Sequence, residues 1–123
     1  MAKIIGTIAA VVVAAGLLTG LAAGRQTPKK AYLLAQVEVS NAEQYQKYAA
    51  AAPDVVAKYG GRYLARGGRS VTLEGPPAKP RVVVIEFPSL EQAQAFYNSP
   101  EYVATRKLRE GAAAGQFVVV EGL

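Results

Sequence analysis

The order of strand-like and helix-like segments after residue 30 most constrains what this chain can fold into. Strand patterns occur at residues 31–39, 62–66, 81–87 and 117–121. Between the first two strands, and again between the last two, apolar and aromatic residues recur at steps of three and four, as on one face of a helix. The order strand, helix, strand, strand, helix, strand predicts an α+β, ferredoxin-like βαββαβ fold with both helices on one face of a four-stranded antiparallel sheet.

Capping residues and helix breakers predict where the first helix begins and ends. Ser40 and Glu43 have the spacing of a capping box, so the helix should begin at about residue 41. Pro53 has no amide hydrogen and should kink the helix or restart it. Gly60, followed by a second glycine, should end it with a left-handed cap.

The second helix should be interrupted. Ser89 and Gln92 form a second capping box at its start. Ser99 and Pro100 then suit the N-cap and the first position of a restarted helix, which should run to about residue 110. Residues 67–80 are rich in Gly and Pro and predict the connection between the second and third strands.

Two of the predicted strands are apolar on both faces. In the third strand Val82 and Val84 lie on one side and Val83 and Ile85 on the other, and residues 117–121 follow the same pattern. Two helices cover only one face of the sheet. We expect the same face of a second copy to cover the other, which gives a two-fold homodimer with sheets packed face to face. The alternative is an open face that exposes a few valines.

The first 24 residues predict a membrane-directed segment. Residues 4–24 are uncharged and, as an N-terminal hydrophobic helix, would extend roughly 31 Å, which matches the hydrocarbon core of a bilayer. Lys3 precedes the run and small residues end it, as in a signal peptide, but its length also suits an uncleaved transmembrane anchor. Positive residues at Arg25, Lys29 and Lys30 leave a cytoplasm-facing domain open as well.

These patterns divide the chain into residues 1–24 as signal peptide or anchor, 25–30 as linker and 31–123 as the folded domain. We therefore expect the protein to be exported, periplasmic or secreted, or anchored in the inner membrane. Its contact with the membrane should then be confined to residues 4–24.

Composition excludes several chemistries. The sequence contains no His and no Cys, so it has no disulfide, thiol nucleophile, His-based triad or His-ligated haem or metal. We expect no metal and no cofactor. The net charge of +5 is modest for nucleic-acid binding, which an exported chain would also have little occasion to perform.

Four stretches of the domain carry a family resemblance: YGGRYLARGG at 59–68, LEG at 73–75, VIEFPS at 84–89 and AFYNSPEY at 95–102. Through them the chain resembles the family catalogued as domain of unknown function 1330 (DUF1330), within the dimeric α/β-barrel superfamily. The resemblance implies the ferredoxin-like fold and a homodimer. It implies no particular reaction, because this fold carries monooxygenases, isomerases, haem-degrading enzymes and binding modules.

Three arginines form the most polar cluster, Arg62, Arg66 and Arg69 around a Gly-Gly turn. Strand alternation predicts that Arg62 and Arg66 share one face. Guanidiniums and turn amides together suit a carboxylate or phosphate group. The alternative is that these arginines pair with nearby glutamates or line a solvated turn.

Tyr32, Tyr63 and Glu86 complete the candidate ligand-binding residues. The two tyrosines can line a pocket for an aromatic or quinone-like ligand. Glu86 is a candidate acid or base if it is buried, and otherwise a partner for an arginine. The other tyrosines fit core packing with their hydroxyls at the rim. No residue is assigned a catalytic role.

Three functions remain open. The first is an envelope-associated, homodimeric small-molecule-binding module that holds an apolar or aromatic, anionic ligand between helices and sheet. The second is a cofactor-independent enzyme, monooxygenase- or isomerase-like, that uses Tyr, Arg and Glu. The third is a structural dimerisation domain. The lack of His counts against the enzyme, so we favour the binding module.

Overall fold

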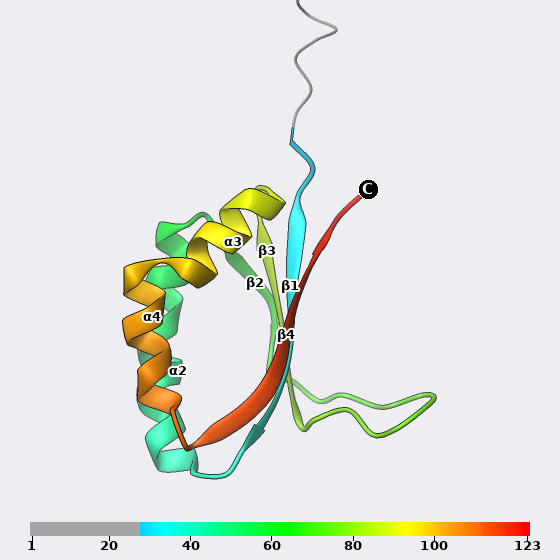
Figure 1. Ribbon diagram of the computed structural model, residues 1–123. Helices are drawn as coiled ribbons and strands as arrows, with labels where there is room; N and C mark the ends of the chain where they lie inside the picture. Colours follow the sequence, from blue (N-terminus) through cyan, green and yellow to red (C-terminus); the bar gives the residue numbers. More distant parts are fainter. Residues whose placement is uncertain (1–27) are drawn as a thin grey trace, which may run out of the picture.

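The computed structural model describes residues 28–123, which form one antiparallel sheet with all helices on one face (Figure 1). The strands, in the spatial order β2-β3-β1-β4, are β1 (Ala31–Val39), β2 (Arg62–Arg66), β3 (Arg81–Phe87) and β4 (Ala113–Glu121). The helices are α2 (Ala42–Lys58), α3 (Leu90–Asn98) and α4 (Pro100–Arg106), which a single 3₁₀ turn, η1 (Lys107–Arg109), extends. The predicted βαββαβ ferredoxin-like fold is confirmed.

The predicted leader at residues 1–24 lies outside the described residues, as does the first half of the linker. Between residues 28 and 123, no helix has both the length and the apolar character needed to cross a bilayer.

Helix α2 and its N-cap each lie one residue later than predicted. The side chain of Asn41, rather than Ser40, accepts the amide of Gln44 at 3.0 Å. The backbone amide of Ser40 donates instead to the carbonyl of Ala112 at 2.8 Å, which ties the chain to the start of β4. Asn caps a helix as well as Ser does, so the cap moves by one residue. At the other end Gly60 has the predicted left-handed conformation, with φ of 79°.

Pro53 does not restart helix α2, which runs as one helix from Ala42 to Lys58. A proline inside a helix leaves the carbonyl four residues earlier without its amide donor. That carbonyl belongs to Ala49, and it accepts a hydrogen bond from the guanidinium of Arg66 on strand β2. A distant side chain therefore supplies the hydrogen bond that the proline removes.

The second helical region is interrupted as predicted. Ser89 caps α3 and accepts the amide of Gln92 at 3.0 Å. Ser99 caps α4 and accepts the amide of Tyr102 at 3.0 Å, with Pro100 in the first helical turn. Strand β4 begins four residues earlier than predicted, because residues 113–116 pair with the end of β1 despite their weak strand propensity.

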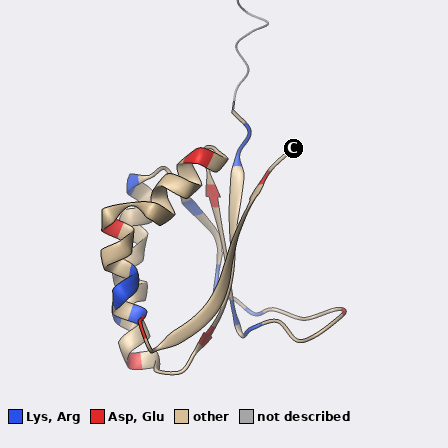
Figure 2. Cartoon of the chain, viewed as in Figure 1, with Lys and Arg blue, Asp and Glu red and all other residues tan. Residues whose placement is uncertain are grey.

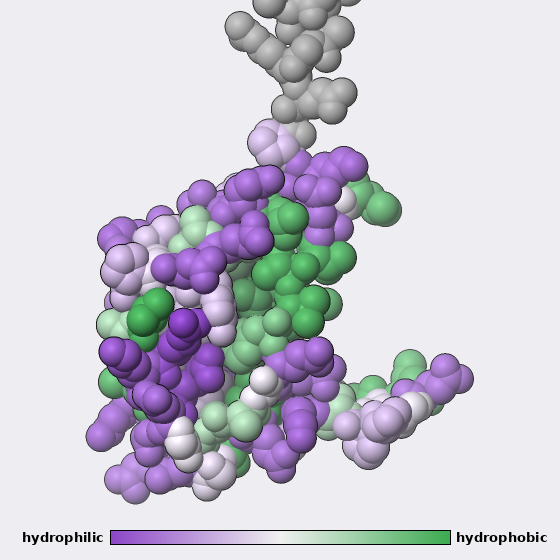
Figure 3. Space-filling model, in the orientation of Figure 1, coloured by the Kyte–Doolittle hydropathy of each residue, from purple (hydrophilic) through white to green (hydrophobic). Residues whose placement is uncertain are grey.

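The two faces of the sheet differ in what covers them. Leu33, Val37 and Phe87 point at the helices and are almost completely buried. The opposite face, here called the open face, carries Leu34, Val82, Val84, Val118 and Val120. Among them Leu34, Val118 and Val120 remain 42, 44 and 49% exposed. Figure 3 shows the resulting hydrophobic surface along the side of the sheet that faces away from the helices.

Candidate functional site

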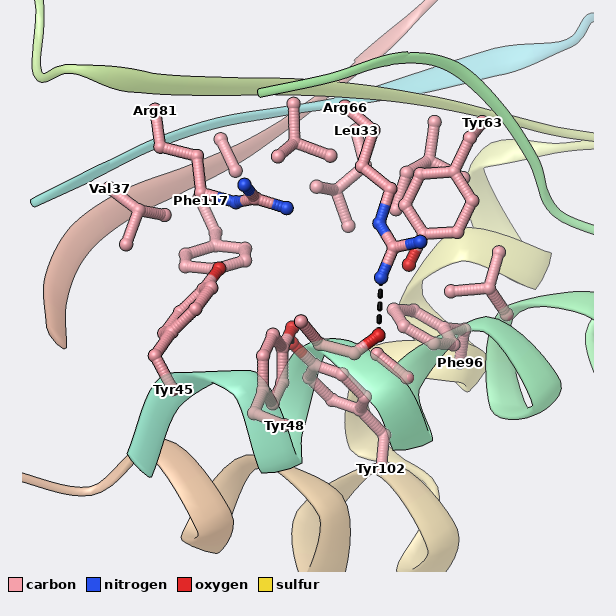
Figure 4. A pocket seen from close by; sticks show the side chains of 16 residues that line it. Leu33, Val37, Tyr45, Tyr48, Tyr63, Arg66, Arg81, Phe96, Tyr102 and Phe117 are labelled. Atoms are coloured by element: carbon pink, nitrogen blue, oxygen red, sulfur yellow. Dashed lines mark hydrogen bonds between the residues drawn. The ribbon is translucent and has the colours of Figure 1, made fainter. Parts of the chain in front are cut away.

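A cavity lies between helix α2 and the covered face of the sheet (Figure 4). Its enclosed space is about 20 Å³, which is room for a group the size of a water molecule or a carboxylate. Aliphatic and Phe side chains form much of its wall. The polar residues around it are Tyr45, Tyr48, Tyr63, Arg66, Arg81 and Tyr102. Within the described part of the chain, no carboxylate lines the cavity.

A β-bulge turns Arg66 into this cavity. Tyr63 pairs with Ile85 and Arg66 pairs with Val83, with a shift of register between Tyr63 and Ala65. In a regular strand, residues three positions apart point to opposite faces. The extra residue of the bulge restores Arg66 to the face of Tyr63. The prediction that Arg62 and Arg66 share a face is therefore wrong.

Arg66 is held at the solvent-exposed side of the cavity by two contacts. Its guanidinium carbon lies 4.9 Å from the centre of the Tyr63 ring, which is a cation–π distance. One terminal nitrogen donates to the Ala49 carbonyl, as Figure 4 shows. A guanidinium has five N–H donors, so Arg66 keeps others for a ligand.

Arg81 is the second guanidinium of the site. It begins β3 and lies on the same face as Val83, with its guanidinium carbon 5.3 Å from the centre of the Tyr45 ring. Its Nε is buried and has no hydrogen-bond partner among the residues that the structure describes. The guanidinium packs against Gly67, where any Cβ would collide with it. Among residues 28–123, neither Arg66 nor Arg81 forms an ion pair with a carboxylate.

Two tyrosine hydroxyls form the buried side of the cavity. Those of Tyr48 and Tyr102 lie 2.6 Å apart in a hydrogen bond. Burial raises the pKa of Tyr48 far above its usual value, and the neighbouring Tyr102 raises it further. Burial also raises the pKa of Tyr63. Tyr48 and Tyr63 therefore stay protonated at neutral pH, and the site combines their neutral hydroxyls with two cations.

Three of the predicted site residues lie on the open face instead. Tyr32 pairs with Glu86 on the neighbouring strand, and Glu86 pairs in turn with Arg62. The Glu86 carboxylate accepts hydrogen bonds from Arg62 at 3.1 Å and from Lys30 at 3.4 Å. Desolvation acts to raise the pKa of Glu86, but Lys30 and Arg62 outweigh it and lower that pKa. Glu86 is therefore an ionised partner of these cations, as the alternative sequence interpretation expected.

The six candidate residues thus separate into three places. Tyr63 and Arg66 come together in the cavity. Tyr32, Arg62 and Glu86 gather on the open face, and Arg69 is exposed in the connection between β2 and β3. In the described part of the chain, no three acidic side chains come together as a metal site would require.

Sequence reasoning missed Arg81 and the tyrosines of α2 and α4 as parts of a site. Arg81 lies two residues before Val83 and four before Ile85, so strand alternation indicated that Arg81 faces the helices as they do. Tyr45, Tyr48 and Tyr102 were expected in the core with hydroxyls at the rim. They are buried, but the hydroxyls of Tyr48 and Tyr102 lie inside. Helical spacing alone does not separate a core tyrosine from one that lines a cavity.

The arrangement of strands and helices defines a ferredoxin-like α+β protein. Residues 30–123 match the family model described as domain of unknown function (DUF1330), and the chain belongs to that family. The sequence matches no curated protein.

Solved structures show the same fold. A protein of unknown function from Rhodopseudomonas palustris has a TM-score of 0.63 and 20% identity, covering 88% of this chain and 92% of its own. SnoaB, a cofactor-independent oxygenase from Streptomyces nogalater, has a TM-score of 0.57 and 7% identity, covering 77 and 94%. A dimeric ferredoxin-like protein of unknown function from Thermobifida fusca has a TM-score of 0.54 and 16% identity, covering 80 and 93%. At these identities the likeness concerns the fold alone.

Proposed function

We propose that the protein is an envelope-associated, homodimeric module that binds a small apolar or aromatic ligand carrying a negative charge. One observation carries the proposal: Arg66 and Arg81 face a tyrosine-lined cavity and have no acidic partner among the described residues. Arg81 is partly buried, and a partly buried guanidinium without a counter-ion is costly. An anion bound between Arg81 and the exposed Arg66 removes that cost.

The size of the cavity limits how such a ligand binds. An enclosed space of about 20 Å³ takes the charged group but not an aromatic ring. The body of the ligand therefore extends past Arg66, the exposed member of the pair, and beside the ring of Tyr63. Planar guanidiniums favour a planar carboxylate, which both can contact with paired hydrogen bonds.

Binding is better supported than catalysis because residues 28–123 place no acid or base suited to neutral pH at the cavity. None of their carboxylates lines it, and the pKa values of Tyr48 and Tyr63 are raised. A general base works best when its pKa lies near the working pH. These hydroxyls serve as hydrogen-bond donors and acceptors instead.

Calorimetric titration of the protein with benzoate tests this proposal. Acetate tests whether the charged group suffices, and benzamide is the uncharged control. We expect saturable binding of benzoate but not of benzamide, and a loss of about tenfold or more in Arg81→Gln, since a charged hydrogen bond contributes about 1.5–3 kcal/mol. Arg69→Gln, which removes an exposed arginine outside the cavity, should bind benzoate normally. Equal binding of benzamide would contradict the proposal.

A second candidate function is a cofactor-independent oxygenase. It is favoured by the likeness to SnoaB together with two guanidiniums able to stabilise a substrate anion. Oxygen uptake that depends on the bound ligand, and that falls in Arg81→Gln, would favour this candidate over simple binding.

The dimer is proposed to form through the open face. Leu34, Val118 and Val120 lie together there, since Leu34 pairs directly with Val118 and residue 32 with Val120. Packing this face against its two-fold copy buries them. Light scattering at micromolar concentration should give the mass of a dimer, and Leu34→Asp should give a monomer. A dimer that binds no ligand would favour the third function, a structural dimerisation domain.

Envelope association is proposed from residues 4–24, whose apolar run suits export or anchoring. Fractionation of the host should place the protein in the periplasm, the medium or the inner membrane. Intact mass separates a cleaved leader from an anchor. Full-length protein in the cytosol would contradict this part of the proposal.

A further inference from the structure

The connection between β2 and β3, residues 67–80, forms an arm that extends from the sheet. In Figure 1 this arm points away from the helices, on the side of the open face. It is therefore built next to the surface through which the proposed dimer forms.

Hydrogen bonds hold the arm in place. The amide of Ala78 donates to the hydroxyl of Thr72 at 3.0 Å, which joins the two limbs of the arm. At its base the amide of Lys79 donates to the side chain of Gln36 at 3.2 Å. The Lys79 ammonium also pairs with Glu38 at 3.2 Å. Gln36 and Glu38 alternate with buried residues of β1, so both lie on the open face and fix the arm to it.

The arm carries apolar side chains that its own chain leaves uncovered. Val71 is 73% exposed and Leu73 is 94% exposed. Between the arm and the sheet runs a groove of about 750 Å³ that includes Gln36, Val71 and Val82 in its lining. Since Gln36 and Val82 belong to the open face, the groove and that face form one continuous surface.

We propose that the arm packs against a second copy of this chain, so that each protomer of the dimer holds the other. The inference rests on the proposed face-to-face dimer, because only that arrangement brings a partner to the side on which the arm projects. Two-fold symmetry makes the contact reciprocal, so Val71 and Leu73 of each copy are covered at the same time. The groove then receives side chains of the partner.

The arm also links the dimer contact to the cavity. Its two ends join Arg66 and Arg81, the two guanidiniums of the candidate site. The guanidinium of Arg81 packs against Gly67, the first residue of the arm. Contact with a partner therefore acts on the segment that joins the two arginines of the candidate site.

Sedimentation equilibrium of the protein purified from its own host tests the arm directly. We expect the wild type to be a dimer and Leu73→Asp to raise its dissociation constant at least tenfold. Leu108→Asp is the matched control, because Leu108 is also exposed, at 39%, but lies on the helical side. Both variants should keep the wild-type circular dichroism, since neither side chain belongs to the core.

A photo-crosslinking amino acid in place of Leu73 gives a second readout. On irradiation it should join two copies covalently, whereas the same substitution of Leu108 should not. The arm proposal is overturned if the wild type is a dimer, Leu73→Asp dissociates no more than Leu108→Asp, and no crosslinked dimer forms. A monomeric wild type would instead overturn the face-to-face dimer itself, and the arm contact with it.

Discussion

The guanidinium of Arg66 donates a hydrogen bond to the carbonyl oxygen of Ala49, the oxygen that Pro53 leaves without a helical donor. One hydrogen bond thus joins the two irregularities, the missing helical donor at Pro53 in α2 and the bulge in β2. The proline leaves the acceptor free, and the bulge turns the arginine towards it. This contact orients one of the two cations of the candidate site.

Replacing Pro53 with Ala should raise the stability of the fold and lower its affinity for the ligand. The new amide donates to the Ala49 carbonyl, so the helix gains a hydrogen bond and the melting temperature should rise. The same amide competes with Arg66, which then loses its orientation, and benzoate affinity should fall about fivefold if the contact contributes about 1 kcal/mol. Calorimetry and thermal melts measure the two effects. In an Arg66→Gln background Pro53→Ala should leave affinity unchanged, and an equal loss there would count against the link.

Gly67 is predicted to be far less tolerant of a side chain than its neighbour. Gly67 has φ of 69° and packs against the guanidinium of Arg81, whereas a Cβ at Gly68 meets open space. Gly67→Ala should cost about 1–2 kcal/mol of unfolding free energy from the left-handed backbone alone and should displace Arg81. Gly68→Ala should be close to neutral. Urea denaturation of both variants makes the comparison, and equal losses would refute it.

The hydroxyl pair of Tyr48 and Tyr102 should behave as a coupled unit. Tyr48→Phe leaves the buried hydroxyl of Tyr102 without its 2.6 Å partner, which should cost about 1–3 kcal/mol. The double variant with Tyr102→Phe should lose less unfolding free energy than the two single variants lose together, because no unpaired hydroxyl remains. Strict additivity in a double-mutant cycle would show that the pair contributes nothing.

Glu101 should give the protein part of its acid sensitivity. Its side-chain hydrogen bond with Lys58 and a further one from Tyr59 lower its pKa to about 2. A carboxylate whose folded pKa is lowered stabilises the fold above its unfolded pKa of 4.5 and loses that contribution as pH falls towards 2. The stability difference between wild type and Glu101→Gln should therefore shrink from pH 5 to pH 2. A difference that stays constant across this range would contradict the assignment.

Local signals were enough to predict the fold. Ser89, Ser99 and Gly60 act through their own backbone neighbourhood, and each has its predicted role. Strand alternation in 31–39 and 81–87 likewise depends only on which side chains are apolar. The cap at Asn41 differs from the predicted Ser40 because two adjacent residues are equally able to cap a helix.

The candidate site was harder to predict because it depends on pairing between distant segments. The bulge in β2 exists only against β3, and it reverses the face on which Arg66 lies. The continuity of α2 through Pro53 depends on a donor from another element. Tyr63 and Arg66 were candidates from the sequence and line the same cavity, but their association with Arg81 follows from tertiary structure alone.

Arg66 and Arg81 are proposed to bind an anionic small molecule. Native mass spectrometry of the protein purified from its own host tests this most directly. The wild type should carry a bound small molecule with an acidic group, and the Arg66→Gln, Arg81→Gln double variant should not. A wild type without bound mass, or a double variant that retains the same ligand, would contradict it.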